Sequence, residues 1–182
     1  MRALFSGPAA WRICGVIGAA ALTATTAYAA QRTIAGTATI IRSMSVSTTA
    51  QMSFGKLQYN NGAGPAVAPL VLRAAPPTAR TSTDVQLLPN GGETPAIRVI
   101  TGEPGRIYRV TPPASATAAP GGLAVTAFTL WSANSGDITS SRLGQLNAQG
   151  RDTIRIGASL MVPRGTKNDT FTANTPVTIT YD

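Results

Sequence analysis

The chain has 182 residues, with 15 Lys and Arg against seven Asp and Glu, a single cysteine and no histidine. The lack of histidine excludes Ser-His-Asp and Cys-His catalytic sites and the usual zinc and copper sites, because these sites use imidazole or thiolate groups. The basic residues are scattered singly along the chain, which argues against nucleic-acid binding and favours a role in solubility.

Residues 1–29 have the pattern of a secretory signal peptide. Arg2 and Arg12 precede an apolar run over residues 13–22, and Ala27-Tyr28-Ala29 forms a small-x-small cleavage site. The run is too short to span roughly 30 Å of hydrocarbon, so we expect no transmembrane segment. We expect an exported protein, in the periplasm, at the cell surface or outside the cell, that begins at Ala30. It would lose Cys14 with the signal and form no disulfide.

The remaining residues, 30–182, predict a single all-β domain with little or no helix. Short alternating runs are separated by turn sequences such as Asn60-Asn61-Gly62, at intervals typical of a β-sandwich. In chain order, the predicted strands cover residues 37–41, 43–48, 51–57, 67–73, 84–88, 96–101, 106–111, 123–131, 153–162 and 177–181.

The alternation within these runs predicts two faces for each strand. In residues 96–101, for example, Ile97 and Val99 alternate with Arg98. A period of two places one face on a core and the other in water. Residues 112–122, by contrast, are a low-complexity stretch of Ala, Pro, Ser, Thr and Gly, which predicts a long loop.

Few residues suggest a catalytic or ligand-binding site. The seven acidic residues fall in or beside predicted turns or at the chain end, where turn geometry and solubility explain them. We therefore expect no catalytic site, no cofactor and no metal, and predict that the protein is not an enzyme. Trp131 has two interpretations: it is a platform on which a sugar stacks, or it is a core residue beside Phe128 and Leu130.

The two ends of the mature chain have the pattern of strands that pair between subunits. In β-strand addition, an extended segment of one subunit completes the sheet of the next, and a small residue passes a crowded point. One face of the first segment, a candidate donor strand, carries Ile34, Gly36, Ala38 and Ile40. The last predicted strand, a candidate pairing strand similar to the one that pilin chaperones grip, alternates Val177, Ile179 and Tyr181. The alternative is that both segments are ordinary strands of a self-contained sandwich.

Several short segments, spread over nearly the whole mature chain, resemble those of a known family in their sequence and order. They are Met52-Ser-Phe-Gly55, Ala96-Ile-Arg-Val99 followed by Thr101-Gly-Glu-Pro-Gly105 and Tyr108, then Ile156-Gly-Ala-Ser-Leu160 and Val177-Thr-Ile-Thr-Tyr181. In this order they resemble the family of domain of unknown function 4402 (DUF4402), exported fimbria-like β-sandwich proteins of Gram-negative bacteria. The chain departs from the family pattern at Asn168-Asp-Thr-Phe171, where a Gly-x-Tyr is expected before the last strand. The resemblance implies an immunoglobulin-like sandwich at the cell surface and no catalytic residues.

Two functions follow from these patterns. The first is an exported structural or adhesive surface protein with an immunoglobulin-like or pilin-like β-sandwich, assembled by β-strand complementation. Its partners would be further copies of itself and a periplasmic chaperone and usher. The second is a monomeric periplasmic or surface module that recognises glycan or protein through its loops, in particular residues 112–122 with Trp131.

Overall fold

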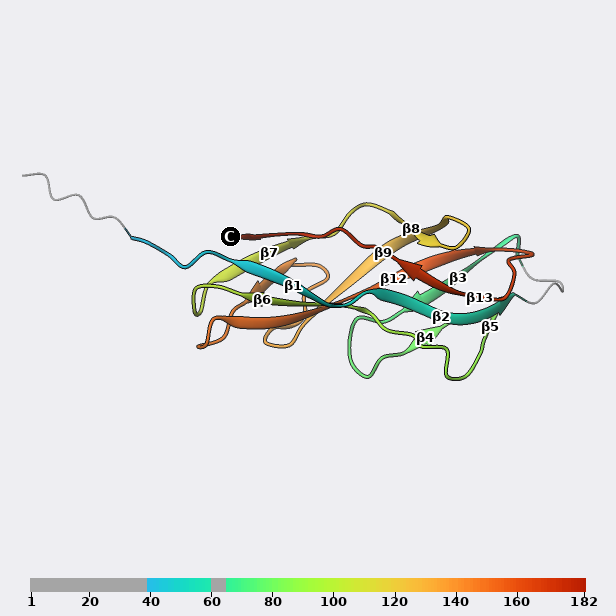
Figure 1. Ribbon diagram of the computed structural model, residues 1–182, viewed down its shortest axis with the longest axis horizontal. Helices are drawn as coiled ribbons and strands as arrows, with labels where there is room; N and C mark the ends of the chain where they lie inside the picture. The colour runs from blue at the N-terminus through green and yellow to red at the C-terminus, as the bar shows by residue number, and fades with distance from the viewer. Residues whose placement is uncertain (1–38, 60–64) are drawn as a thin grey trace, which may run out of the picture. The chain divides into compact units, whose positions relative to one another are not determined.

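The computed structural model describes residues 39–59 and 65–182, and within them all regular structure is β-strand (Figure 1). The strands are β1 (Ser45–Ala50), β2 (Met52–Tyr59), β3 (Val67–Leu72), β4 (Arg80–Thr81), β5 (Val85–Leu87), β6 (Ala96–Thr101), β7 (Ile107–Thr111), β8 (Ala116–Ala119), β9 (Leu123–Ser132), β10 (Gly136–Asp137), β11 (Leu143–Gln145), β12 (Arg151–Pro163), β13 (Asp169–Ala173) and β14 (Thr178–Tyr181). The described residues belong to one unit, Thr39–Asp182, and among them there is no helix long and apolar enough to cross a membrane. The predicted all-β class is confirmed. The predicted signal peptide lies outside the described residues.

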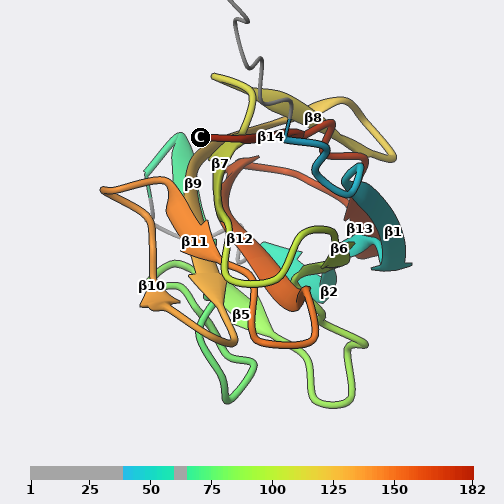
Figure 2. The ribbon, with the colours of Figure 1, turned by 90° about the vertical axis from the view of Figure 1, so that its left-hand side faces the viewer.

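Two antiparallel sheets curl around the core. The larger sheet has eleven strands, with the order β1-β6-β12-β9-β8-β13-β2-β5 along its main path, and the smaller has the order β11-β7-β14. Seen from one end, the strands surround a common interior, with β14 and β7 on one side and β1 and β6 on another (Figure 2). This arrangement of packed, curled antiparallel sheets is consistent with a β-sandwich.

Strand β12 organises the larger sheet because it changes partner along its length. Its first half pairs with β6 and its second half with β3, while β9 lies along its other edge. Gly157 lies between the two halves, where a Cβ atom would overlap the carbonyl oxygen of Leu72 and the amide nitrogen of Ala74. Glycine therefore allows a close approach of backbones that any side chain would obstruct.

The core consists of apolar side chains that alternate along the strands and face the interior. They form one continuous cluster that includes Phe54, Leu57, Leu72, Ile100, Leu130 and Ile156. Fully burying side chains of this kind stabilises the fold by about 1.5–3 kcal/mol each. Without any disulfide between described residues, this packing holds the two sheets together.

Nine of the ten predicted strands are present, with ends that differ by at most a few residues. The exception is residues 37–41, whose described part is irregular and exposed, because no neighbouring strand pairs with it. The loop predicted over residues 112–122 is partly wrong, since it contains β8. This strand of small residues is held by pairing with both β9 and β13, and tertiary pairing of this kind overrides a weak local preference.

The predicted alternation of β6 is present, but the polar residue lies on its buried face. Arg98 is only 7% exposed, whereas Ile97 and Val99 are half-buried on the other face. The Arg98 guanidinium donates hydrogen bonds to the backbone oxygens of Ala50 (2.9 Å) and Ile97 (3.2 Å). Burial lowers the pKa of Arg98, and these carbonyl contacts offset part of the cost of desolvating the charge.

A buried carboxylate joins the two sheets. Tyr108 on β7 donates its hydroxyl hydrogen to Oδ2 of Asp152 on β12 (2.5 Å), and the Ser132 hydroxyl on β9 donates to the same oxygen (2.6 Å). The backbone N–H groups of Thr153 (2.6 Å) and Asn134 (3.3 Å) donate to Oδ1. Four donors therefore satisfy a carboxylate that would otherwise be costly to bury.

Candidate functional site

The first strands, β1 and β2, form an almost continuous run that changes partner near Gln51. β1 pairs with β6, whereas β2 pairs with β13 and β5. The register of β1 shifts between Thr48 and Ala50, and Ala50 is the residue whose carbonyl accepts the Arg98 hydrogen bond. Arg98 thus stabilises the point at which the chain leaves β6 and joins β13.

The last two strands, β13 and β14, also differ in the number of strands that pair with them. β13 pairs with both β2 and β8, whereas β14 pairs with β7 alone within the described part of the chain. No strand among residues 39–59 and 65–182 takes, beside β14, the place that β2 takes beside β13, because β1 pairs with β6 instead. We call this side of the last strand, which no described strand pairs, the β14 edge. In Figure 2, β1 and β14 lie around the same end of the fold, with residues 39–44 between them.

Backbone groups of β14 point outward at this edge. The Asp182 N–H donates to the carbonyl of Ile107 on β7 (3.2 Å). Backbone groups of successive residues in an antiparallel pair point alternately toward and away from the partner. Thr180 therefore directs its N–H and C=O to β7, while Ile179 and Tyr181 direct theirs to the β14 edge.

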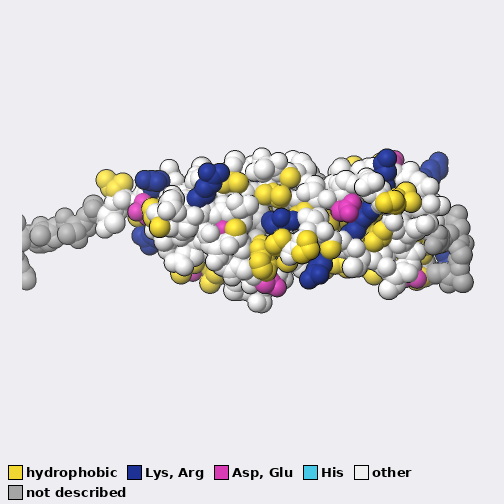
Figure 3. Space-filling view, turned by 90° about the horizontal axis from the view of Figure 1, so that it is seen from below, with side chains coloured by type: hydrophobic (Ala, Val, Ile, Leu, Met, Phe, Trp, Pro, Cys, Tyr) yellow, Lys and Arg dark blue, Asp and Glu magenta, His cyan; other side chains and the backbone are white. Residues whose placement is uncertain are grey.

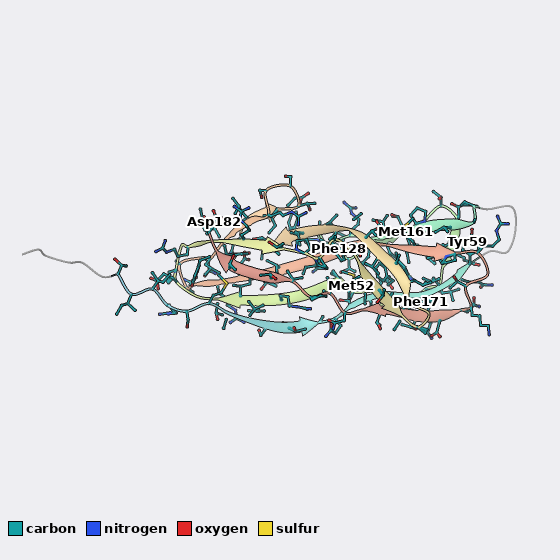
Figure 4. All side chains as sticks on the ribbon, turned by 90° about the horizontal axis from the view of Figure 1, so that it is seen from above. Met52, Tyr59, Phe128, Met161, Phe171 and Asp182 are labelled. Carbon is teal, nitrogen blue, oxygen red and sulfur yellow. The ribbon has the colours of Figure 1, made fainter. Side chains whose placement is uncertain are left out.

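Burial along the last strands changes at the same place. Inward-facing Phe171 and Ala173 on β13 are 3% and 2% exposed. The residues that continue this alternation pack against the core but are only partly buried; they are Val177, Ile179 and Tyr181. Figure 4 shows Phe171 and Tyr59 toward one end of the unit and Asp182 at the other. The covered half of the last strands is thus the half that β2 pairs, and the partly covered half is at the β14 edge.

Tyr181 holds the start of the described chain beside this edge. Its hydroxyl donates to the carbonyl of Arg42 (2.8 Å) and accepts the N–H of Glu103 (2.7 Å). The N–H of Arg42 donates to the Glu103 carboxylate (2.9 Å). A Cβ atom at Gly102 would overlap the Tyr181 hydroxyl, so glycine there makes room for the contact. Next to this anchor, Ile40 is 95% exposed.

The sequence-predicted site residues fall in two groups. Val177 directly precedes β14, and Ile179 and Tyr181 lie within it. Of the candidate donor strand, Ile40 is described and lies in no strand, and the other members lie outside the described residues; they are Ile34, Gly36 and Ala38. Met44, which falls within the strand predicted over residues 43–48, lies just before β1 and is partly buried against the core.

Residues 120–122, the end of the predicted loop, do not lie beside Trp131. Trp131 lies near one end of β9, whereas residues 120–122 precede the other end, because β9 runs unbroken from Leu123 to Ser132. Nor does Trp131 belong to the core, unlike Leu130 beside it. The expectation that it is a core residue is therefore wrong, because the outer face of β9 is only partly covered.

Lys and Arg side chains stand apart along the face shown in Figure 3. Among residues 39–59 and 65–182, no three His, Cys, Asp or Glu side chains lie close enough to hold a metal ion.

Comparison with known proteins gives one match. The family model described as "Domain of unknown function (DUF4402)" matches residues 44–181, which is more than half of the chain and extends from Met44 to Tyr181 of the β14 edge. No curated protein and no solved structure is significantly similar to the chain.

Proposed function

The chain belongs to the DUF4402 family, and we propose that it is an exported structural or adhesive surface subunit that assembles by β-strand complementation. In this mode of association, an extended segment of one copy adds as a strand to an open sheet edge of another. The observation that carries the proposal is the β14 edge: a strand with one partner among the described residues and a half-buried inward face. A periplasmic chaperone would protect the same edge before assembly.

The acceptor has both features that an added strand requires. Outward-pointing backbone groups of Ile179 and Tyr181 supply hydrogen bonds, and an exposed edge of this kind is otherwise a liability that proteins cover. The partly buried side chains at the edge supply apolar surface that an incoming strand would cover. Backbone pairing gives the affinity, and the alternate side chains of the incoming strand give specificity.

The donor is the candidate strand that ends at Ile40. Its apolar and small side chains suit a half-open apolar edge, and the exposed position of Ile40 leaves it available to another copy. The Tyr181–Arg42 hydrogen bond holds the described residues that follow Ile40 against the fold. In the proposed assembly, the donor strand would pair with the β14 edge of a neighbouring copy.

Amide hydrogen exchange tests the acceptor directly, because adjacent residues of β14 differ in where their N–H groups point. In the monomer of residues 30–182, we expect rapid exchange at Ile179 and Tyr181 and slow exchange at Thr180. In assembled protein all three amides would exchange slowly, since a second strand then pairs with the edge. Protection of Ile179 in a form shown to be monomeric would contradict the proposal.

Substitution of the donor tests the other half of the interaction. Gly36→Val places a branched side chain on the inward face of the donor, whereas the matched control Thr37→Val changes the opposite face. We expect size-exclusion chromatography and electron microscopy to show assemblies for the control and only monomers for Gly36→Val, with equal thermal stability of the two monomers. Equal assembly by both variants would refute the donor assignment.

A further inference from the structure

A separate hollow of about 280 Å³ lies on the outer surface around Trp131. Its walls come from three places: β9, the turn that follows β3, and β10 with the residues after it. The residues that bear on its chemistry are Arg73, Trp131, Asp137 and Thr139. The volume is just below the about 300–1,000 Å³ of sites for drug-sized ligands, which suits a single small ring.

The indole of Trp131 forms an apolar surface within this hollow. The neighbours of Trp131 on β9, Leu130 and Ser132, are buried on the inner face, so its own side chain lies on the outer face, where it is half-buried. Across the ladder it faces Arg155 on β12 and Asp137 on β10. An indole held between charged residues at the surface offers a flat apolar face to a ligand that is itself partly polar.

The carboxylate beside the indole is fixed in place. Gly136, whose φ of 75° is a conformation that favours glycine, lies at the start of β10, which pairs with β9 beside Trp131. Asp137 then accepts the N–H of Thr139 (2.9 Å), while the Thr139 hydroxyl donates to the carbonyl of Leu130 (3.3 Å). Hydrogen bonds from Thr139 lower the pKa of Asp137. The side chain is therefore an ionised, exposed acceptor at neutral pH.

The two arginines near the indole, Arg73 and Arg155, differ in the hydrogen bonds that their side chains make. Arg155 is engaged, because its Nε donates to the carbonyl of Ala74 (3.0 Å) and its guanidinium also donates to the Thr78 hydroxyl (2.5 Å). Arg73 is exposed and makes no side-chain hydrogen bond or ion pair with residues 39–59 and 65–182. The hollow therefore combines a flat apolar ring, an anionic acceptor and a cationic donor.

We propose that this hollow is a subsite for one neutral sugar ring, such as the terminal hexose of a glycan. A pyranose has an apolar C–H face, which would stack on Trp131, and a rim of hydroxyl groups. Asp137 would accept hydrogen bonds from two adjacent hydroxyls, and Arg73 would donate to a third oxygen. In this orientation, the Asp137 carboxylate would repel an acidic group on the side of the ring that faces it, which disfavours an acidic sugar there. One ring in an open hollow binds weakly, and repetition of the subsite along an assembly of copies would raise the avidity.

The chain supplies its own reporter for this proposal. Its two tryptophans are Trp11 and Trp131, so in the chain of residues 30–182 all tryptophan fluorescence comes from Trp131. We would titrate this protein with the methyl glycosides of glucose, galactose, mannose and N-acetylglucosamine, and with glucuronate as the acidic comparison. The expected result is a saturable fluorescence change with at least one neutral sugar and a weaker response to glucuronate.

Two variants decide whether the response comes from the proposed subsite. Asp137→Asn keeps the acceptor for the Thr139 N–H but removes the charge, and we expect it to weaken binding about tenfold or more. The matched control, Arg164→Gln, changes an exposed arginine outside the hollow and should leave the affinity unchanged. The proposal is overturned if none of the four glycosides gives a saturable change, or if Asp137→Asn binds as the unsubstituted protein does. Strand addition is tested separately from sugar binding. Gly36→Val should prevent assembly but leave the sugar titration unaltered, so either proposal can fail without the other.

Discussion

Removal of one hydroxyl, by Tyr108→Phe, tests how strongly the buried carboxylate joins the two sheets. Tyr108 is fully buried, and its hydroxyl donates to Asp152, which is itself 3% exposed. A hydrogen bond to a charged group contributes about 1.5–3 kcal/mol. The carboxylate keeps its other donors in the variant, so the penalty for an unsatisfied buried charge is only partial. We therefore expect the free energy of unfolding to fall by about 2 kcal/mol.

Urea unfolding of the chain of residues 30–182, followed by far-ultraviolet circular dichroism, measures this loss. The matched control is Tyr59→Phe, because Tyr59 is also a buried residue, but its hydroxyl donates to a neutral acceptor, the carbonyl of Pro65, in a partly buried hydrogen bond. For that bond we expect a loss of about 1 kcal/mol. If Tyr108→Phe costs no more than Tyr59→Phe, the charge of the carboxylate adds nothing to the stability of the fold.

Three further predictions concern other features. Burial, together with the hydrogen bond to Asp152 and the charge of Asp152, raises the pKa of Tyr108. The resulting stability is complete below the unfolded tyrosine pKa of about 10 and is lost as pH rises above it, so urea titrations above that pH should show a steeper decline for the unsubstituted protein than for Tyr108→Phe. Gly157→Ala should lower the free energy of unfolding by roughly 1–3 kcal/mol, because its Cβ would meet backbone atoms of Leu72 and Ala74; a thermal melt matching that of the unsubstituted protein would be evidence against this close approach. Ile40→Asp should change monomer stability by less than about 0.5 kcal/mol, because the side chain is exposed, but should reduce assembly in size-exclusion chromatography, and undiminished assembly would argue against its place in the donor.

The sequence alone determined the fold class and most strands, because the signals for them are local. A period of two and turn residues between runs depend only on neighbours along the chain. The bounds predicted for residues 96–101 coincide with β6, and those for residues 123–131 differ from β9 by a single residue. The alternation of Val177, Ile179 and Tyr181 is likewise a local pattern, and the short segments that resemble DUF4402 are local too, a resemblance that the family match confirms.

Only the tertiary structure decided how the strands pair, and which of them lack a second partner among the described residues. β8 and β13 have weak local signals and exist because strands distant in sequence pair with them. Arg98 lies on the buried face because a strand pattern distinguishes two faces without stating which one meets the core. The β14 edge depends on β1 pairing with β6 rather than with β14. That choice rests on contacts between residues more than 40 positions apart, and no pattern within a single strand encodes it.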